Sequence, residues 1–286
     1  MRIFITGAQG TLGQALTAAL ESQHEVVGRD IDALDVTDTH SVNTWIGEGR
    51  PDLVIHCAAM TAVDYCAEHP DEALTVNGYG TQAVALACQA SDAALLYVST
   101  NEVFDGLTDR QYLEYDAPAP ANPYAYSKWV GEQMVRDLVR KHTIVRTSWL
   151  FAHGGKNFVQ TILRLARQNV PLRVVTNEVS SPTYTTDLAA AIAALIETRQ
   201  YGIYHLVNEG YTSRYGFART ILDLAGYVDT PIEPIALAEY QRPSRPPQYA
   251  MLRNFAAARL GITLRPWQDA LAAFLEVENA KHEQAG

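Results

Sequence analysis

The sequence contains little cysteine and no long hydrophobic run. Its three cysteines, Cys57, Cys66 and Cys88, are too few and too scattered for a disulfide framework or a zinc site, so we expect free thiols in a reducing compartment. No apolar run approaches the ~20 residues of a membrane-spanning helix, and the N-terminus lacks the apolar stretch of a signal peptide. These absences predict a cytoplasmic protein that is not inserted in a membrane.

Positive charge is also in short supply. Lys and Arg number 22 against 32 Asp and Glu, which gives a net charge of −10 and a pI of about 5.2. An acidic surface argues against nucleic acid or an anionic membrane as the main partner, but it leaves room for a small anionic ligand in a local basic pocket. The 286 residues, 48% of them hydrophobic, suffice for one large domain or two modest ones.

Short apolar segments alternate with helical patterns through the first half of the sequence. Residues 2–6, 25–28, 52–59, 93–100 and 143–151 have the near-continuous apolar character of strands that are buried on both faces. Helical patterns separate them, including a long one from about Pro70 to Ala90. This alternation predicts an α/β fold, a Rossmann-type doubly wound parallel sheet with a smaller C-terminal substrate-binding region.

The pattern loosens after about residue 150. Helices are predicted near 156–169, 185–197, 213–226 and 266–280, a strand near 201–207, and an irregular Pro-rich segment at 229–248. We therefore predict a dinucleotide-binding domain over residues 1–150. Residues 151–286 would form mainly a substrate-binding region, with some segments returning to the first domain.

A glycine-rich loop, TGAQGTLG, directly follows the first predicted strand and opens a helix. Gly7, Gly10 and Gly13 permit a tight turn, close approach of a pyrophosphate and close packing of helix on strand. The helix N-terminus would offer unpaired N–H groups to the phosphates. The alternative is a structural turn without a ligand, but the position between strand and helix favours a dinucleotide.

Two neighbouring residues at the end of the second strand give opposite signals about the cofactor. Asp30 could bond the adenosine ribose hydroxyls and favour NAD, whereas Arg29 could pair with a 2′-phosphate and favour NADP. A solvated surface charge is the plain alternative for Arg29. We expect NADPH, with NADH as the alternative.

The segment PYAYSK places Tyr124 and Lys128 four residues apart, on one face of a predicted helix. A cation one turn away can stabilise a phenolate and lower the tyrosine pKa, which prepares the residue for acid–base chemistry. Tyr126 lies about 200° around the helix axis from Tyr124 and cannot share this arrangement. The pair follows Ser99 and Thr100, which end a predicted sheet strand, so all would meet at the carboxyl edge where cofactor clefts form.

These features together resemble the extended short-chain dehydrogenase/reductase family, which has a TGxxGxxG loop, a Ser/Thr after the fourth strand and a YxxxK helix. Further segments narrow the resemblance to its dTDP-4-dehydrorhamnose reductases: HCAAMTAVDYCAEHPDEALTVN, YVSTNEVFDG, VRTSWLF, SSPTYTTDLA and RPSRPPQYAMLRN. The resemblance covers nearly the whole chain. It implies NAD(P)H-dependent reduction of the C4 keto group of dTDP-4-dehydro-L-rhamnose to dTDP-L-rhamnose.

The resemblance also implies a role for individual residues. Tyr124 would donate the proton to the C4 oxygen, Lys128 would lower the Tyr124 pKa and hold the ribose, and Thr100 would bond the reacting oxygen. Trp149 would pack near the sugar, and Arg245 would bind the nucleotide end of the substrate. The remaining cofactor contacts would come from Gly10, Thr11, Leu12, Asp30, Asp35, Val36, Ala59, Met60 and Thr61. A core aromatic and a surface arginine are the plain alternatives for Trp149 and Arg245.

The chain departs from the family pattern STDYVF, for which it has STNEVF. Asn101 removes a negative charge but can still accept, and now also donate, a hydrogen bond to a sugar hydroxyl. Glu102 either faces solvent or adds an acid near the substrate. A lineage variant with unchanged chemistry is the favoured interpretation; a related 4-ketosugar with another stereochemical outcome is the alternative.

Two further classes of function stay open at this stage. A non-catalytic relative, such as the regulatory subunit of methionine adenosyltransferase, would bind a partner protein, although Tyr124 and Lys128 are both retained. A nucleotide-sugar epimerase or dehydratase would fit the half-present Asp-Glu pair at Asn101 and Glu102. Magnesium-linked dimers occur in the resembled family; here we predict no metal and leave a homodimer open.

Overall fold

The computed structural model describes the backbone of residues 1–285 and the side chains of residues 1–280. Six parallel strands form the main sheet, in the order β2 (Glu25–Arg29), β1 (Arg2–Thr6), β3 (Leu53–His56), β4 (Ala94–Thr100), β5 (His142–Thr147) and β10 (Gly202–His205). The strand order reverses between β1 and β3, which is where open α/β sheets bind ligands. The predicted doubly wound α/β fold is confirmed.

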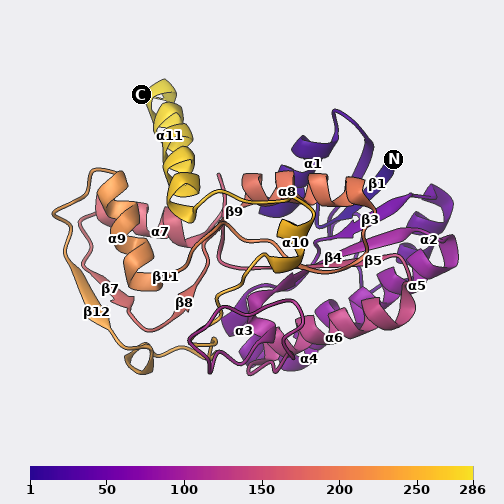
Figure 1. Cartoon of the computed structure of the whole chain (residues 1–286), viewed down its shortest axis with the longest axis horizontal. Coiled ribbons are helices and arrows are strands. Elements are labelled where there is room, and N and C mark those ends of the chain that lie inside the picture. The colour runs from indigo at the N-terminus through magenta and orange to yellow at the C-terminus, as the bar shows by residue number, and fades with distance from the viewer. Residues whose placement is uncertain (286) are drawn as a thin grey trace.

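Helices cover both faces of the sheet (Figure 1). One face carries α1 (Thr11–Leu20) and α8 (Thr185–Thr198), and the other carries α2 (Thr39–Gly49), α5 (Thr81–Ser91) and α6 (Pro123–Leu138). In β1, Ile3 and Ile5 pack toward the first layer and Phe4 toward the second. Alternate residues thus enter two cores, which explains why the strand is apolar throughout.

The predicted helix from Pro70 to Ala90 forms, with an interruption. Before it comes α3 (Val63–Glu68); then α4 (Pro70–Leu74) runs through a π-helical turn, η1 (Thr75–Gly80), into α5. The π-turn holds Asn77, whose amide bonds the backbone N–H and C=O of Met60 at 2.8 and 3.0 Å. This reciprocal pair of hydrogen bonds fixes the loop that follows β3.

Most of the chain after residue 150 builds a second core beside the sheet (Figure 1). Its elements are β6 (Leu150–Phe151), α7 (Phe158–Arg167), β7 (Leu172–Val175), β9 (Thr183–Tyr184), α9 (Arg214–Leu224), β12 (Ile232–Ile235) and α11 (Trp267–Ala285). Shorter elements complete the region: β8 (Val179–Ser180), β11 (Thr212–Ser213), η3 (Leu237–Glu239) and α10 (Phe255–Arg259). Because α8 and β10 join the sheet layers, the chain crosses back after residue 150.

Two predicted segments differ from the structure. The single strand expected at 143–151 is two strands, because Trp149 adopts a left-handed φ of 43° and turns the chain from β5 into β6, which pairs with β9. The segment 229–248, predicted as irregular, contains β12. Its Pro234 is exposed, and a proline is tolerated in a strand where its missing N–H costs no ladder bond.

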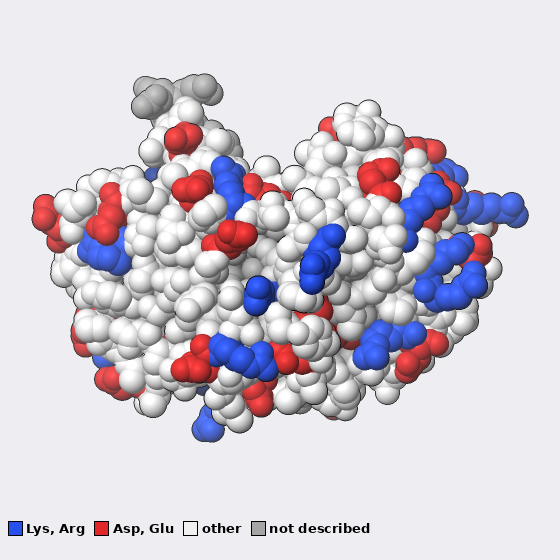
Figure 2. Space-filling view, in the orientation of Figure 1, with Lys and Arg blue, Asp and Glu red and all other residues white. Residues whose placement is uncertain are grey.

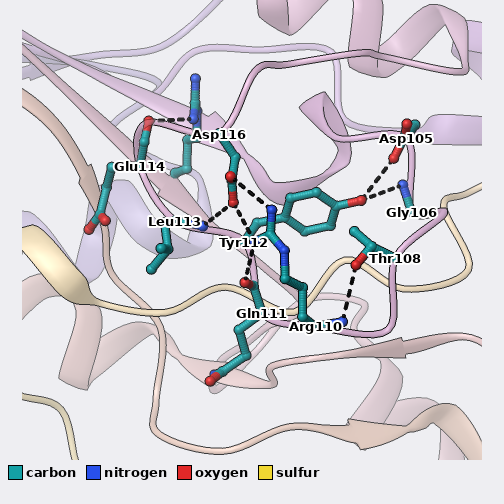
Figure 3. Close-up of polar contacts among 10 residues, drawn as sticks. Asp105, Gly106, Thr108, Arg110, Gln111, Tyr112, Leu113, Glu114 and Asp116 are labelled. Carbon is teal, nitrogen blue, oxygen red and sulfur yellow. Dashed lines mark hydrogen bonds and ion pairs between the residues drawn. The ribbon is translucent and has the colours of Figure 1, made fainter.

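The long connection over residues 104–122 has no regular helix but is held by polar contacts (Figure 3). The Tyr112 hydroxyl donates to Asp105 at 2.8 Å, and Arg110 forms a bidentate ion pair with Asp116 at 2.7 and 2.9 Å. The segment joins the short 3-10 turn η2 (Asn101–Val103) to α6. Its internal bonds fix the spacing between the residues that end β4 and those that begin α6.

Candidate active site

A cavity of about 700 Å³ lies at the carboxyl edge of the sheet, within the range typical of small-molecule sites. The ends of β1, β3 and β4, the starts of α1 and α6, and the turn from β5 into β6 line it. Most predicted site residues contribute to this lining: Gly7, Gly10, Thr11, Leu12, Gly13, Asp30, Ala59, Thr61, Thr100, Asn101, Tyr124, Lys128 and Trp149. Arg29, Asp35, Val36, Met60 and Arg245 lie outside it.

The glycine loop fits a pyrophosphate. A Cβ on Gly13 would lie 2.2 Å from the Gly7 carbonyl oxygen, and one on Gly7, with φ +68°, would lie 2.7 Å from the Ala58 nitrogen. Gly10 caps α1 without a side-chain bond, so the first N–H groups of the helix have no side-chain acceptor. Close backbone approach and a bare helix N-terminus are the features that bind phosphate groups.

The adenosine end of the site contains one of the two predicted selectivity residues. Asp30 lines the cavity and accepts from the backbone N–H groups of Gln9 and Ile31, both at 2.9 Å. Arg29 is exposed, with its guanidinium 5.5 Å from the Trp45 ring centroid.

The next two predicted adenosine contacts serve local structure. Asp35 is exposed and accepts from the backbone and hydroxyl of Thr37, at 2.9 and 2.8 Å. Val36 is buried in the core beside Gly80, so its side chain packs inside the protein rather than against the cavity.

Tyr124 and Lys128 occupy the first turns of α6, as the sequence predicts. Asn122 caps this helix by accepting from the Ala125 N–H at 2.9 Å, and Pro123 stands at its first position. Both side chains are buried at the cavity, whereas Tyr126 is exposed. The Lys128 ammonium lies 4.2 Å from the ring centroid of Tyr97, and burial lowers the pKa of Lys128 to about 7, with Cys57 and Glu132 acting in the opposite direction.

The pKa of Tyr124 moves in the direction opposite to the prediction. Burial raises it above the ordinary value, the charge of Glu102 raises it further, and a hydrogen bond with Thr100 only partly offsets them. The expected lowering by Lys128 is therefore wrong for this structure. Tyr124 is protonated at neutral pH, the state that a proton donor needs.

Asn101 lines the cavity, but its amide is committed to the protein. Its Nδ2 donates to the Ser180 hydroxyl at 3.0 Å and to the Ala250 carbonyl at 3.1 Å. Its Oδ1 accepts from the Thr100 hydroxyl at 3.3 Å. Asn101 therefore ties the end of β4 to two segments of the C-terminal region.

Glu102 is half-buried and lines the cavity. Its Oε2 accepts from the Asn122 Nδ2 at 2.8 Å, and burial raises its pKa to about 6. The same Asn122 nitrogen donates to the Arg245 carbonyl at 3.3 Å, while the Arg245 side chain is exposed. Of the predicted nucleotide contact, only the backbone of Arg245 lies near the site.

Trp149 belongs to a charged cluster on the C-terminal side. The Arg214 guanidinium lies 3.6 Å from the Trp149 ring centroid and pairs with the buried Glu178 at 2.9 Å. Arg214 and Glu178 have no motif that would single them out in the sequence. Arg214 begins α9 and Glu178 directly precedes β8, so only the tertiary structure brings the two residues to Trp149.

Lys156 also lines the cavity, and the sequence analysis did not predict it. It follows Gly154 and Gly155, both in the left-handed region with φ of +71° and +68°, and a Cβ on Gly155 would lie 3.5 Å from Thr11. The adjoining glycines were the only available signal. In the residues whose side chains are described, no group of three or more His, Cys, Asp and Glu side chains could hold a metal ion.

One face of the molecule carries both signs of charge. Figure 2 shows acidic and basic side chains interspersed over one face of the molecule. None of the described helices is long and apolar enough to cross a membrane.

Comparison with known proteins places the chain in a family. A family model, the RmlD substrate binding domain, matches residues 1–279. The dTDP-4-dehydrorhamnose reductase of Mycobacterium tuberculosis is 39% identical over 286 residues, covering 96% of this chain and 92% of that protein. A dTDP-4-keto-6-deoxy-D-glucose reductase of Streptomyces niveus is 34% identical, covering 98% of each.

A solved structure agrees with these sequence relatives. The dTDP-4-dehydrorhamnose reductase of Bacillus anthracis, in complex with NADP, has a TM-score of 0.93 and 37% identity, covering 96% of this chain and 98% of that one. A UDP-glucose 4-epimerase of Thermus thermophilus, with NAD, has a TM-score of 0.83 at 21% identity and shares the fold alone. The chain therefore belongs to the RmlD substrate binding domain family, together with the dTDP-4-dehydrorhamnose reductases that resemble it.

Proposed function

We propose that this protein reduces the C4 keto group of dTDP-4-dehydro-L-rhamnose to a hydroxyl with NADPH, giving dTDP-L-rhamnose. The observation that carries the proposal is the cavity at the sheet edge, which brings Tyr124, Lys128 and Thr100 together with the glycine loop. Reductases of dTDP-linked 4-keto sugars are among the relatives that match along nearly the whole chain.

The residues of the cavity have separate roles in this reaction. The reduced nicotinamide, when bound, supplies the hydride that adds to C4. Tyr124 transfers its phenolic proton to the C4 oxygen, so the C=O bond becomes a C–OH group, and the phenolate left behind takes a proton from solvent. Thr100 holds the reacting oxygen beside Tyr124, and Lys128 orients the ribose.

The glycine loop would hold the pyrophosphate, with Asp30 at the adenosine ribose. Arg29 is exposed at the end of β2, where its guanidinium could pair with a 2′-phosphate. A relative at 37% identity binds NADP, which supports NADPH as the cofactor here.

The competing classes have less support. A non-catalytic binding role would not require a protonated tyrosine, a threonine and a lysine around a nucleotide loop. The likeness to epimerases rests on the fold alone. The similarity to a dTDP-4-keto-6-deoxy-D-glucose reductase supports one alternative substrate, a 4-keto sugar of another configuration.

The test is oxidation of NADPH or NADH by the purified protein with dTDP-4-dehydro-L-rhamnose or dTDP-4-keto-6-deoxy-D-glucose. We expect faster oxidation with NADPH and with the rhamnose precursor, and NMR of the product should show the rhamnose configuration. Faster turnover of the D-glucose compound would assign the alternative sugar. No sugar-dependent oxidation would contradict the proposed function.

A further inference from the structure

The position of Glu102 is set by the end of β4. Thr100 caps η2, and its hydroxyl accepts from the Glu102 N–H at 3.2 Å. The turn sends the Glu102 side chain into the cavity that Tyr124 also lines, and its charge raises the pKa of Tyr124. Glu102 is thus a neighbour of the proposed proton donor.

One oxygen of this carboxylate is held and the other is available. Oε2 accepts from Asn122, the residue that caps the helix of Tyr124. Among the residues whose side chains are described, Oε1 has no hydrogen-bond partner. Asn122 therefore fixes the carboxylate through Oε2 and leaves Oε1 as an unused acceptor on a residue that lines the cavity.

The charges around Glu102 are already paired with other groups. Arg214 and Arg242 lie close enough to lower its pKa, but Arg214 pairs with Glu178 and Arg242 with Asp64, at 2.9 and 2.8 Å. Glu102 forms no ion pair with any described side chain. A desolvated carboxylate without a cation is costly unless a donor satisfies it.

The chemistry of this acceptor limits what it can bind. A carboxylate that is mostly ionised above its pKa of about 6 would repel the diphosphate of a nucleotide sugar and attract a neutral O–H donor. The sugar ring, which must meet Tyr124 through its C4 oxygen, presents such a donor on the adjacent carbon C3.

We propose that Glu102 is a specificity-determining residue, whose Oε1 accepts a hydrogen bond from the C3 hydroxyl of the 4-keto sugar. The inference rests on the proposed function and goes beyond it, because it assigns the hydroxyl that the site reads. A bound sugar without this hydroxyl would displace water from the carboxylate without replacing its hydrogen bond, and the protein would select against such a sugar.

The test compares kcat/KM of Glu102→Gln and of the wild type on two substrates, dTDP-4-dehydro-L-rhamnose and its 3-deoxy analogue. We expect Glu102→Gln to lower kcat/KM about 10-fold on the hydroxylated sugar and to change it no more than about twofold on the 3-deoxy sugar, since only the first loses a charge-assisted bond. Asp109→Asn is the matched control, because Asp109 is exposed and outside the cavity lining. NADPH affinity and the unfolding midpoint establish that each variant is folded.

The outcomes separate the two claims. An equal loss on both sugars, or no loss on either, would overturn the recognition of the C3 hydroxyl while leaving the reductase intact. Absence of sugar-dependent oxidation by the wild type would instead overturn the proposed function, and the inference with it.

Discussion

The Arg146 guanidinium and the Glu132 carboxylate form a bidentate ion pair in the protein interior, with Nη2–Oε2 and Nε–Oε1 distances of 2.6 and 2.9 Å. Ser99 also donates to Glu132, at 2.6 Å. The pair joins α6 to β4 and β5, one helical turn beyond Lys128. It therefore holds the helix of Tyr124 against the strand that ends at Thr100.

Replacing Arg146 should strongly destabilise the protein. Arg146→Met leaves Glu132 as a buried charge without a cation, and we expect a decrease of about 3–5 kcal/mol in the free energy of unfolding. Arg173→Ala, which breaks an exposed pair with Glu233, should cost less than about 1 kcal/mol. Urea unfolding of both variants measures the difference, and similar costs would refute a structural role for the buried pair.

Asn101→Asp should destabilise the protein, although the related family has Asp at this position. A carboxylate cannot donate to the Ala250 carbonyl, and it would add a charge beside Glu102. We expect a loss of about 1–3 kcal/mol in the free energy of unfolding. Thermal unfolding at neutral pH is the measurement, and an unchanged midpoint would show that the amide bonds to Ser180 and Ala250 are dispensable.

Glu102 should make stability depend on pH with a defined sign. Its folded pKa of about 6 lies above the ordinary 4.5, so its contribution is fully present below the lower value and lost as the pH rises through the higher one. Glu102→Gln cannot titrate and so lacks this contribution. Relative to that variant, the free energy of unfolding of the wild type should fall by on the order of 2 kcal/mol between about pH 4 and about pH 8.

The titratable and charged groups that face Glu102 come from several elements: Tyr124 on α6, Cys66 on α3, Arg214 on α9, Glu178 before β8, and Arg242 after η3. Unfolding free energies of wild type and Glu102→Gln at both pH values test the sign. A difference that stays constant with pH would contradict a raised pKa.

Lys156 should contribute to cofactor affinity through the phosphates near Thr11. Lys156→Ala should weaken NADPH binding about two- to fivefold, and the loss should shrink as salt increases, because the lysine is exposed. Arg167→Ala removes an exposed cation at the other end of α7 and should leave affinity unchanged. Fluorescence titration with NADPH at two salt concentrations measures these affinities. Equal NADPH affinities for the wild type and Lys156→Ala would exclude a contact between Lys156 and the phosphates.

The site residues whose places in the fold agree with the sequence depend on neighbours in the sequence. The glycine loop and the Tyr124–Lys128 spacing are local patterns, and each directly follows or opens an element whose apolar period is clear. The strand order then brings them to one edge, since parallel strands end on the same side.

The parts that were missed depend on distant contacts. Asn101 bonds Ser180 and Ala250, which lie 79 and 149 residues away, so its orientation has no signal in the STNEVF segment. The sequence left the direction of Glu102 open, because Asn122 holds its carboxylate from the far end of a long loop. The sign of the Tyr124 pKa shift was missed because it follows from burial and from Glu102. No periodicity encodes those distances.

The most direct test is sugar-dependent NADPH oxidation by Tyr124→Phe, with Tyr126→Phe as the matched control on the same helix. The account predicts that Tyr124→Phe abolishes turnover while NADPH affinity stays near the wild-type value, and that Tyr126→Phe has a mild effect because its side chain is exposed. A Tyr124→Phe protein that binds NADPH weakly yet turns over at the normal rate would contradict the account. So would a collapse of turnover in Tyr126→Phe.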